Sequence, residues 1–344
     1  MKFLIYSDVH FCENSSIVRS IGKKYSTRLE NLIKSINWAE DFAQVMSCDE
    51  IICLGDFFNK PDLNSRELTA LQDICWSKLP HTFLVGNHDA CDKSLFYNSV
   101  TALKNNGFEI ITEPTFRLVD GKKYIFLPYI TEDNRKSLDY YIDLFPAELT
   151  YIFSHNDIKG IRYGAFESNE GFDVKEIEQK CKIFLNGHLH NMEKFCRNGL
   201  NIGNLTGQNF SEDAKKYSHC CVILDTSDNS IELFENPYAL NFYKLDYTDT
   251  NSDNYCFELK NNAVLSIRCK ANQVDYIRAS LKACSDSIVE ARVSVIPDSI
   301  DLQTSAESTK SFSHGDHKEK FRLFCHQNLT PSTILVQELN EVCK

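Results

Sequence analysis

Two histidines follow a short apolar run near the middle of the chain. Ile183-Phe184-Leu185 predicts a buried strand, and Asn186-Gly187-His188-Leu189-His190 comes directly after it. Side chains two residues apart on extended chain point to the same side, so His188 and His190 are expected to face one point. A lone His-x-His pair is a weak signal. Its meaning therefore depends on what other segments bring to that point.

The first 90 residues alternate between expected strands and expected helices. Strands are predicted at residues 2–7, 50–54 and 82–85, and amphipathic helices at 27–46 and 65–78. This alternation is typical of an α/β layered fold. Polar residues follow each strand, at the edge where open α/β sheets bind ligands.

Further strands and helices are predicted along the rest of the chain. Strands are expected at 108–111, 115–119, 124–129, 151–153, 194–196, 200–202, 220–224 and 230–234, with a hairpin turn at Asp120-Gly121, a helix at 134–145 and a loop at 160–171. The short later strands favour a second sheet packed on the first. We therefore expect one α/β domain at residues 1–236.

A change of pattern begins at Pro237. Strands at 242–247, 263–268 and 288–296 with a helix at 273–284 predict a small α+β domain at 237–297. A polar linker follows, and residues 318–327 and 332–342 are expected to form helices within a last segment, 298–344. Packing of these helices on the chain's own core and binding to a partner both remain open.

Composition excludes some classes of protein. The 14 cysteines include no Cys-x-x-Cys pair, and Met1 leads straight into Lys2-Phe3-Leu4-Ile5-Tyr6, which is too short for a signal peptide. We expect reduced cysteines, a cytoplasmic protein (in a host's cytoplasm if viral) and no membrane span, since no apolar run approaches ~20 residues. The net charge of −11 does not favour nucleic-acid binding, which needs Lys and Arg on phosphates.

The predicted strand ends carry one set of potential metal ligands. These are Asp8, His10, Asp56, Asn87, His88, His155, His188 and His190. Imidazole, carboxylate and amide groups suit Mn, Fe or Zn better than Ca or Mg. One shared carboxylate, Asp56, could bridge two ions ~3.5–4 Å apart, which is the arrangement of a phosphoryl-transfer site.

The blocks Asp8-x-His10, Gly55-Asp56, Gly86-Asn87-His88-Asp89, His155 and Gly187-His188-x-His190 resemble those of calcineurin-like metallophosphoesterases. The resemblance implies a two-sheet sandwich flanked by helices, with the α+β unit as a capping domain and C-terminal helices. Within the superfamily the chain most resembles the nuclease subunit of SbcCD-type and phage recombination complexes. The Gly-Asp block continues as Phe57-Phe58-Asn59, and the chain extends beyond the core.

The resemblance also implies roles for individual residues. Asp8, His10, Asp56 and His190 would hold one ion, and Asp56, Asn87, His155 and His188 the other, with Mn²⁺ expected and Mg²⁺, Fe²⁺ or Zn²⁺ as alternatives. His88 would face the scissile phosphate and Asp89 would orient its imidazole. Asn59 stands where nuclease relatives often have His or Asp, which puts a substrate-positioning role there in doubt.

The implied function is a DNA nuclease of recombination, repair and replication. Its relatives act as 3′→5′ exonucleases on duplex ends and endonucleases on single strands, as homodimers with a coiled-coil ATPase bound through C-terminal helices. Lys23, Lys24 and Arg28 are candidate DNA-backbone contacts, although a solvated helix start explains them equally well.

Two alternatives to the nuclease remain. A stand-alone phosphoesterase acting on a small nucleotide or phosphoprotein fits the acidic charge better, but it leaves the residues beyond 236 unexplained. A metal-free scaffold would be expected to lose ligands, and the sequence retains them all.

Overall fold

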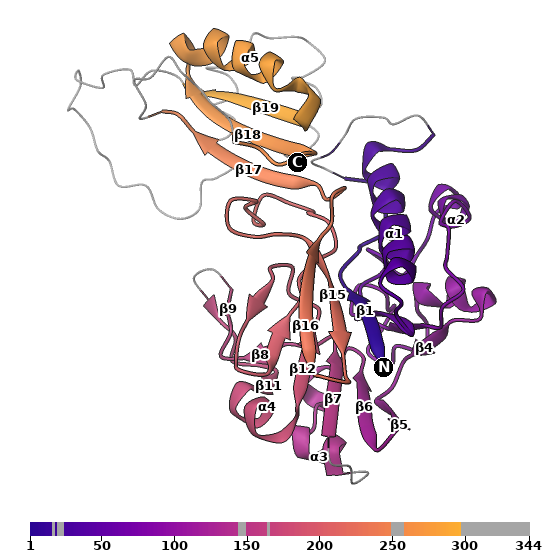
Figure 1. Cartoon of the computed structure of the whole chain (residues 1–344). Coiled ribbons are helices and arrows are strands. Elements are labelled where there is room, and N and C mark those ends of the chain that lie inside the picture. The colour runs from indigo at the N-terminus through magenta and orange to yellow at the C-terminus, as the bar shows by residue number, and fades with distance from the viewer. Residues whose placement is uncertain (16–17, 19–23, 144–148, 164–165, 249–257, 297–344) are drawn as a thin grey trace, which may run out of the picture. The chain divides into compact units, whose positions relative to one another are not determined.

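The structure is a computed structural model, and it describes residues 1–15, 18, 24–143, 149–163, 166–248 and 258–296 (Figure 1). The predicted linker, the predicted C-terminal helices and Lys23 lie outside the described residues. Met1–Ile296 forms one compact unit. The predicted domain boundaries at 236 and 297 stay a prediction.

Two six-stranded mixed sheets form the centre of this unit. The first holds, in spatial order, β16 (Ser230–Glu235), β15 (Cys220–Asp225), β1 (Lys2–Tyr6), β2 (Glu50–Cys53), β3 (His81–Leu84) and β4 (Glu109–Ile111). The second holds β13 (Glu193–Lys194), β14 (Gly199–Asn201), β12 (Ile183–Asn186), β7 (Leu149–Ser154), β6 (Lys122–Leu127) and β5 (Thr115–Val119). Strands β1 to β4 are parallel to one another, as are β6, β7, β12 and β14. Their carboxyl ends carry the predicted ligands.

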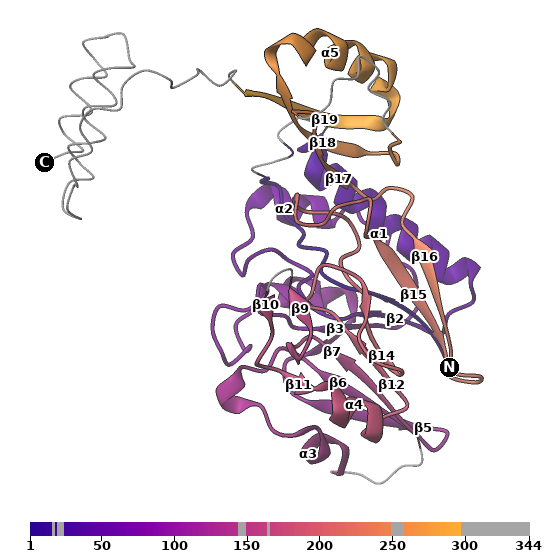
Figure 2. The same cartoon turned by 90° about the vertical axis from the view of Figure 1, so that its left-hand side faces the viewer.

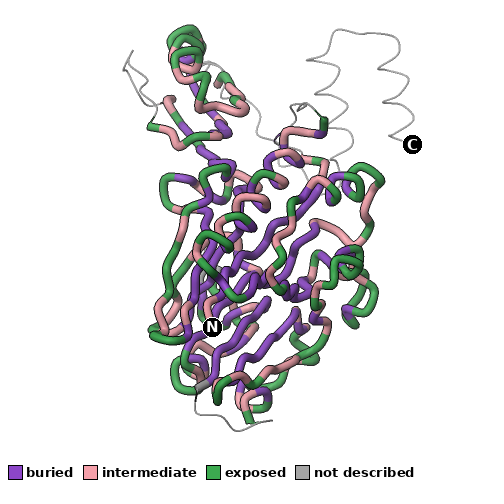
Figure 3. Tube along the Cα trace, turned by 45° about the vertical axis from the view of Figure 1, so that its right-hand side comes forward, coloured by how far each residue is buried: buried purple, intermediate pink, exposed green. Residues whose placement is uncertain are grey.

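Strand β1 shows why the sheets pack as layers. Successive side chains on a strand point to opposite faces. Phe3 and Ile5 face the second sheet, where they pack among residues such as Phe153, while Leu4 and Tyr6 pack with the helices on the other face. A strand that is apolar on both faces must be covered on both. Figure 3 shows the resulting run of buried strands.

Helices cover the outer faces of both sheets. α1 (Thr27–Val45) and α2 (Ser65–Leu71) pack on the first sheet, and α3 (Leu138–Asp143) and α4 (Val174–Lys180) on the second, as Figure 2 also shows. Short 3₁₀ turns span Ser99–Asn106 (η1), Glu132–Asn134 (η2), Ala271–Gln273 (η3) and Ser285–Ser287 (η4). The predicted α/β class, with two sheets flanked by helices, is confirmed.

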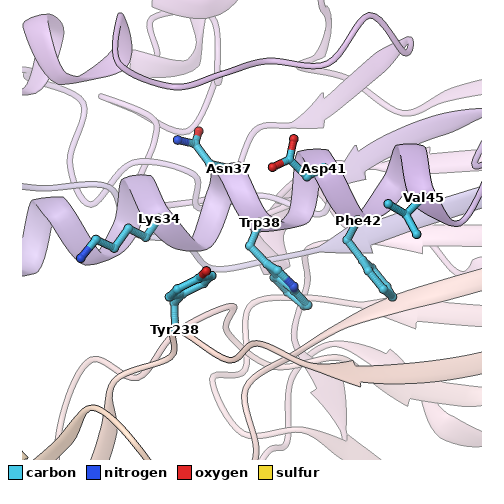
Figure 4. A pocket seen from close by; sticks show the side chains of 7 residues that line it. All are labelled: Lys34, Asn37, Trp38, Asp41, Phe42, Val45 and Tyr238. Atoms are coloured by element: carbon cyan, nitrogen blue, oxygen red, sulfur yellow. The ribbon is translucent and has the colours of Figure 1, made fainter. Parts of the chain in front are cut away.

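The outer side of α1 is not fully covered. Trp38 and Phe42 stack with ring centroids 5.4 Å apart, and with Tyr238 they line a surface hollow of about 420 Å³ (Figure 4). None of the residues that line this hollow is a predicted ligand.

A separate three-stranded parallel sheet follows the sandwich. It consists of β17 (Asn241–Asp246), β18 (Ala263–Lys270) and β19 (Ile288–Ile296), and α5 (Val274–Ala283) packs on it through Ile277. The loop before β15 is joined to this sheet, since Ala214 N–H donates to the Phe242 carbonyl at 2.9 Å.

Several predicted elements differ from the observed ones. The helix predicted at 65–78 ends at Leu71, because α1 side chains take the backbone N–H groups further on: Cys75 donates to Asn37 and Ser77 to Glu40. Of the helix predicted at 134–145, Leu138–Asp143 forms α3, Asn134 ends the turn η2, and residues 144–145 lie outside the described residues. The predicted loop at 160–171 contains the paired strands β9 (Arg162–Tyr163) and β10 (Phe166–Glu167), while β8 (Ile158–Lys159) pairs with β11 (Phe172–Asp173).

Among the described residues, no helix has the length and apolar character needed to cross a membrane.

Candidate metal centre

The structure brings the predicted ligands together from both sheets. Asp8 and His10 follow β1, Asp56 follows β2, and Asn87 and His88 follow β3, while His155 follows β7 and His188 and His190 follow β12. Their ligand atoms form three overlapping groups, each within 4.8 Å: Asp8, His10 and His190; His10, Asp56 and His88; Asp56, His155 and His188. Asp56 and His10 each belong to two groups.

Each carboxylate is anchored by one oxygen and turns the other toward the cluster. Asp8 Oδ2 accepts from Ser7 Oγ at 2.5 Å and from His188 N at 3.0 Å, while Oδ1 is buried with no hydrogen-bond partner among the described residues. Asp56 Oδ1 accepts from His88 N at 2.8 Å, and its Oδ2 faces His155 Nε2 at 3.2 Å. The second oxygen of each carboxylate therefore faces a histidine of the cluster, since Asp8 Oδ1 lies 3.9 Å from His10 Nε2.

Three imidazoles follow the same plan. His155 Nδ1 donates to the Leu54 carbonyl at 2.8 Å, His190 Nδ1 to Glu212 Oε1 at 2.9 Å, and His188 Nε2 lies 3.3 Å from Asp157 Oδ1. A protein acceptor on one ring nitrogen fixes the tautomer that leaves the other nitrogen free for a metal. The other nitrogens of His155 (Nε2) and His188 (Nδ1) have no hydrogen-bond partner among the described residues, and Nε2 of His190 faces His10 Nε2.

The unpartnered buried atoms test whether divalent ions fit here. Asp8 Oδ1, Asn87 Oδ1, His155 Nε2 and His188 Nδ1 are all buried without a hydrogen-bond partner among the described residues. In addition, His10 Nε2 and His190 Nε2 face each other at 3.1 Å. Buried polar groups are normally satisfied, so this convergence of orphaned donors to metal fits divalent cations.

Backbone strain is concentrated at the same residues. Asp8, His10, Asp56 and His188 all have left-handed φ values, of 50°, 48°, 47° and 73°. Such conformations cost about 1–3 kcal/mol each in non-glycine residues and cluster at functional sites. The tight loops need them to turn each side chain back over the end of its strand.

Two motif glycines are required because the ligand loops pack closely. A Cβ on Gly86 would lie 2.1 Å from Asp56 Oδ1, and a Cβ on Gly187 would lie 2.0 Å from Ser7 Oγ. Any side chain at either position would therefore displace a carboxylate or its anchor.

The electrostatics follow from burial and from the shared carboxylate. Burial raises the pKa of Asp56, but the neighbouring His155 and His10 outweigh burial and hold it well below its usual range. Burial lowers the pKa of His155, but Asp56 outweighs this and raises it to about 9. Asp56 is thus ionised and positive charge is favoured beside it.

His88 stands apart from the other histidines because it is exposed. Its ring lies edge-on to that of His10, with centroids 4.7 Å apart, and its Nδ1 donates to the backbone carbonyl of Asn59 at 3.2 Å. The Asn59 side chain has no part in this contact. The doubt about position 59 therefore does not extend to the orientation of His88.

The predicted role of Asp89 needs correction. Asp89 is fully buried and accepts from Phe58 N at 2.7 Å and Gly86 N at 2.9 Å, so it joins two ligand loops instead of orienting the His88 imidazole. Burial, with Asp56 nearby, raises the pKa of Asp89 to about 8.

Two candidate DNA contacts are engaged elsewhere. Arg28 is buried and its guanidinium donates to the Gly207 carbonyl at 2.6 Å, so it does not face solvent as a backbone contact would require. Lys24 is exposed, but its Nζ lies 2.6 Å from Asp73 Oδ2. Lys23 lies outside the described residues.

Two carboxylates that support the cluster are absent from the predicted site residues. Asp157 was visible two residues after His155, where strand alternation would have placed it on the same side. Glu212 lies in a loop without any pattern, yet it is completely buried against His190. Nothing in the sequence near Glu212 signals that contact.

Comparisons with known proteins identify a family and several solved structures that resemble the chain. These structures include the protein TT1561 of Thermus thermophilus (12% identity, 68% of this chain and 98% of that one, TM-score 0.40). They also include the calcineurin-like phosphoesterase YfkN from Bacillus subtilis (9%, 68% and 88%, TM-score 0.38) and a dimetal phosphatase from Danio rerio (11%, 65% and 91%, TM-score 0.38). A search of curated protein sequences finds no significant match. The family model of the calcineurin-like phosphoesterases matches residues 1–277, and the chain therefore belongs to the calcineurin-like phosphoesterase family.

Proposed function

We propose that the chain is a two-metal phosphodiesterase that cleaves DNA. The observation that carries the metal assignment is the position of Asp56, whose ligand oxygen belongs to a group with His10 and to a group with His155 and His188. Asp8, His10, Asp56 and His190 would hold one ion. Asp56, Asn87, His155 and His188 would hold the other, and Mn²⁺ suits this mixture of imidazole and oxygen ligands.

The ions would supply a nucleophilic water and would stabilise both the attacking and the leaving oxygen. The protein's own residues prepare the site for this chemistry. Asp8 and Asp56 each turn one oxygen toward the histidines of the cluster. Leu54, Asp157 and Glu212 hold three imidazoles by one ring nitrogen, so that the other nitrogen faces the cluster. The ligands therefore need little rearrangement on binding.

His88 is the residue placed to act on the substrate. In its imidazolium form Nδ1–H stays on the Asn59 carbonyl, and the second N–H is left to donate to a phosphate oxygen or to the leaving 3′ oxygen. Asp89 supports this placement indirectly by tying the segments at Phe58 and Gly86 together.

The DNA substrate rests on the resemblance to SbcCD-type nucleases, which is carried by Phe57-Phe58-Asn59, by the small α+β unit after the core and by the predicted C-terminal helices. The same resemblance supports 3′→5′ exonuclease and single-strand endonuclease activity, a homodimer and a cytoplasmic setting. It also supports a coiled-coil ATPase partner bound through the predicted helices at 318–327 and 332–342. A small-substrate phosphoesterase is the second candidate, and the net charge of −11 favours it.

Degradation of end-labelled duplex and single-stranded DNA with Mn²⁺ tests the proposal. The purified chain is compared with His88→Ala, and bis-p-nitrophenyl phosphate serves as a small diester. We expect the wild type to cut DNA and the variant to spare it while binding Mn²⁺ normally. Hydrolysis of the small diester with DNA left intact, both alone and with a coiled-coil ATPase, would refute the nuclease and leave the small-substrate enzyme.

A further inference from the structure

A short hairpin follows His88 and Asp89 directly. Ala90 and Asn98 pair at its base, Cys91 N–H donates to the Tyr97 carbonyl at 2.9 Å, and Ser99 N–H donates to the Asp89 carbonyl at 2.9 Å. The hairpin is therefore fixed at both ends to the segment that carries His88.

The tip of this hairpin exposes two aromatic rings. Phe96 is 72% and Tyr97 65% exposed, and their rings meet edge to face with centroids 5.0 Å apart. The preceding Leu95 is buried in the core on the helix-covered side of the first sheet, and Asn98 Nδ2 donates to the Leu95 carbonyl at 2.7 Å. The rings are thus held outward by an anchored backbone.

Phe96 and Tyr97 line a hollow of about 610 Å³. Pro61, two residues after the Asn59 carbonyl that holds His88, lies on one side, and Cys91, three residues after His88, lies on another. Both segments that position His88 therefore continue into the wall of this hollow. Lys104 contributes a cationic side chain to the lining.

We propose that Phe96 and Tyr97 stack on an unpaired base of the nucleic-acid strand whose phosphate lies at the metal centre. This inference rests on the proposed nuclease function and deepens it, because it specifies a single-stranded or frayed end as the bound form. The exposed face of an aromatic ring accepts the face of any base, so the contact is independent of sequence. Lys104 supplies a positive charge for the backbone of the same strand.

A nucleobase explains the hollow better than a protein partner does. Cys91, three residues after His88, lines the hollow, so a ligand in the hollow and a phosphate at the metal centre can belong to one polymer. Two adjacent rings and a lysine are the combination that binds single-stranded nucleic acid. Docking of a protein partner would not depend on the presence of bases.

The test compares oligodeoxynucleotides with and without bases. The full chain carrying Phe96→Ala and Tyr97→Ala is set beside Tyr140→Ala, a matched control whose ring is 53% exposed and meets Tyr141 edge to face on α3. Each is also made in a His88→Ala background, and the Kd for a fluorescein-labelled single strand is measured by anisotropy with Mn²⁺. A second oligonucleotide carries a run of abasic residues.

We expect the double variant to raise the Kd for the normal strand at least tenfold, since base stacking is lost, and to change the Kd for the abasic strand by less than twofold. The ratio of kcat/KM on the single strand to that on bis-p-nitrophenyl phosphate should fall by a similar factor. Tyr140→Ala should leave both measurements unchanged. Melting temperature and Mn²⁺ binding confirm that the double variant is folded.

An unchanged Kd for the normal strand, or an equal loss on both strands, overturns base stacking. If the wild type cuts DNA and the variants do so equally well, the inference alone fails. If the wild type hydrolyses the small diester but neither binds nor cuts DNA, the proposed nuclease function has failed and this inference falls with it.

Discussion

Replacement of Glu212 by Gln tests how strongly the second carboxylate supports His190. Glu212 Oε1 accepts from His190 Nδ1 at 2.9 Å and from Asn209 Nδ2 at 3.0 Å, while Oε2 accepts from Asn204 Nδ2 at 2.9 Å and from Gln208 N at 2.7 Å. Glutamine has the same shape but only one acceptor oxygen. Two of the four donors must therefore face an NH₂ group.

Glu212→Gln is expected to change two quantities, the free energy of unfolding and the affinity for metal. Each buried donor that loses its acceptor costs about 1–3 kcal/mol, so the free energy of unfolding should fall by roughly 2–6 kcal/mol. Loss of the carboxylate also makes the His190 imidazole a weaker ligand, and changes of this kind typically lower metal affinity 10–100-fold. That factor corresponds to about 1.4–2.7 kcal/mol.

Isothermal titration with Mn²⁺ and urea unfolding measure the two quantities separately. Glu232→Gln, an exposed position on β16, is the matched control and should match the wild type in both. Mn²⁺ affinity within twofold of the wild type in a folded Glu212→Gln protein would refute the reasoning, because it would mean that His190 binds without its carboxylate partner.

Three other substitutions test separate parts of the structure. Gly187→Ala places a Cβ 2.0 Å from Ser7 Oγ, and urea unfolding should show a free energy of unfolding lower by about 1–3 kcal/mol or more. In the control Gly121→Ala the new Cβ meets nothing within 4 Å, so this variant should add only backbone strain. Burial lowers the pKa of His219 to about 4, so the unfolded chain takes up the proton at a higher pH than the folded chain, and the free energy of unfolding should fall as pH drops from about 6.5 to 4. His219→Gln should reduce this dependence of the free energy of unfolding on pH, measured by urea unfolding. An unchanged pH dependence would contradict the assignment to His219. Asp56→Asn should weaken binding of both Mn²⁺ ions in a titration, and loss of only one would exclude a shared carboxylate.

The ligand cluster was predictable because it obeys a local rule. Each ligand stands immediately after an apolar strand, as Asp8 does after β1 and His155 after β7, and parallel strands end at one edge of a sheet. The α/β class followed from the same alternation. Both features are determined by residues only a few positions apart in the chain, and such local patterns can be read directly from the sequence.

The features that were missed depend on contacts distant in sequence. Glu212 meets His190 across a loop that is fixed by its bond to β17, and Asp89 accepts from the backbone N–H of Phe58, which is 31 residues away. The burial of Arg28 is a different case, because the helical spacing of the sequence predicts it. Arg28 lies four residues before Leu32 on α1, and residues at that spacing share a helix face, so its burial beside the core was readable.

The position of the site across the two sheets has a consequence for folding. Asp8 and Asp56 come from the first sheet, while His155, His188 and His190 come from the second. An ion bound by these residues would connect the two sheets, so ion binding and folding would be thermodynamically linked. At a concentration one hundred times Kd, such an ion adds about 2.7 kcal/mol to the stability of the folded chain. If the proposed ions bind, chelation should weaken the packing of the two sheets against each other, and the concentration of free ion would then control the stability of the sandwich.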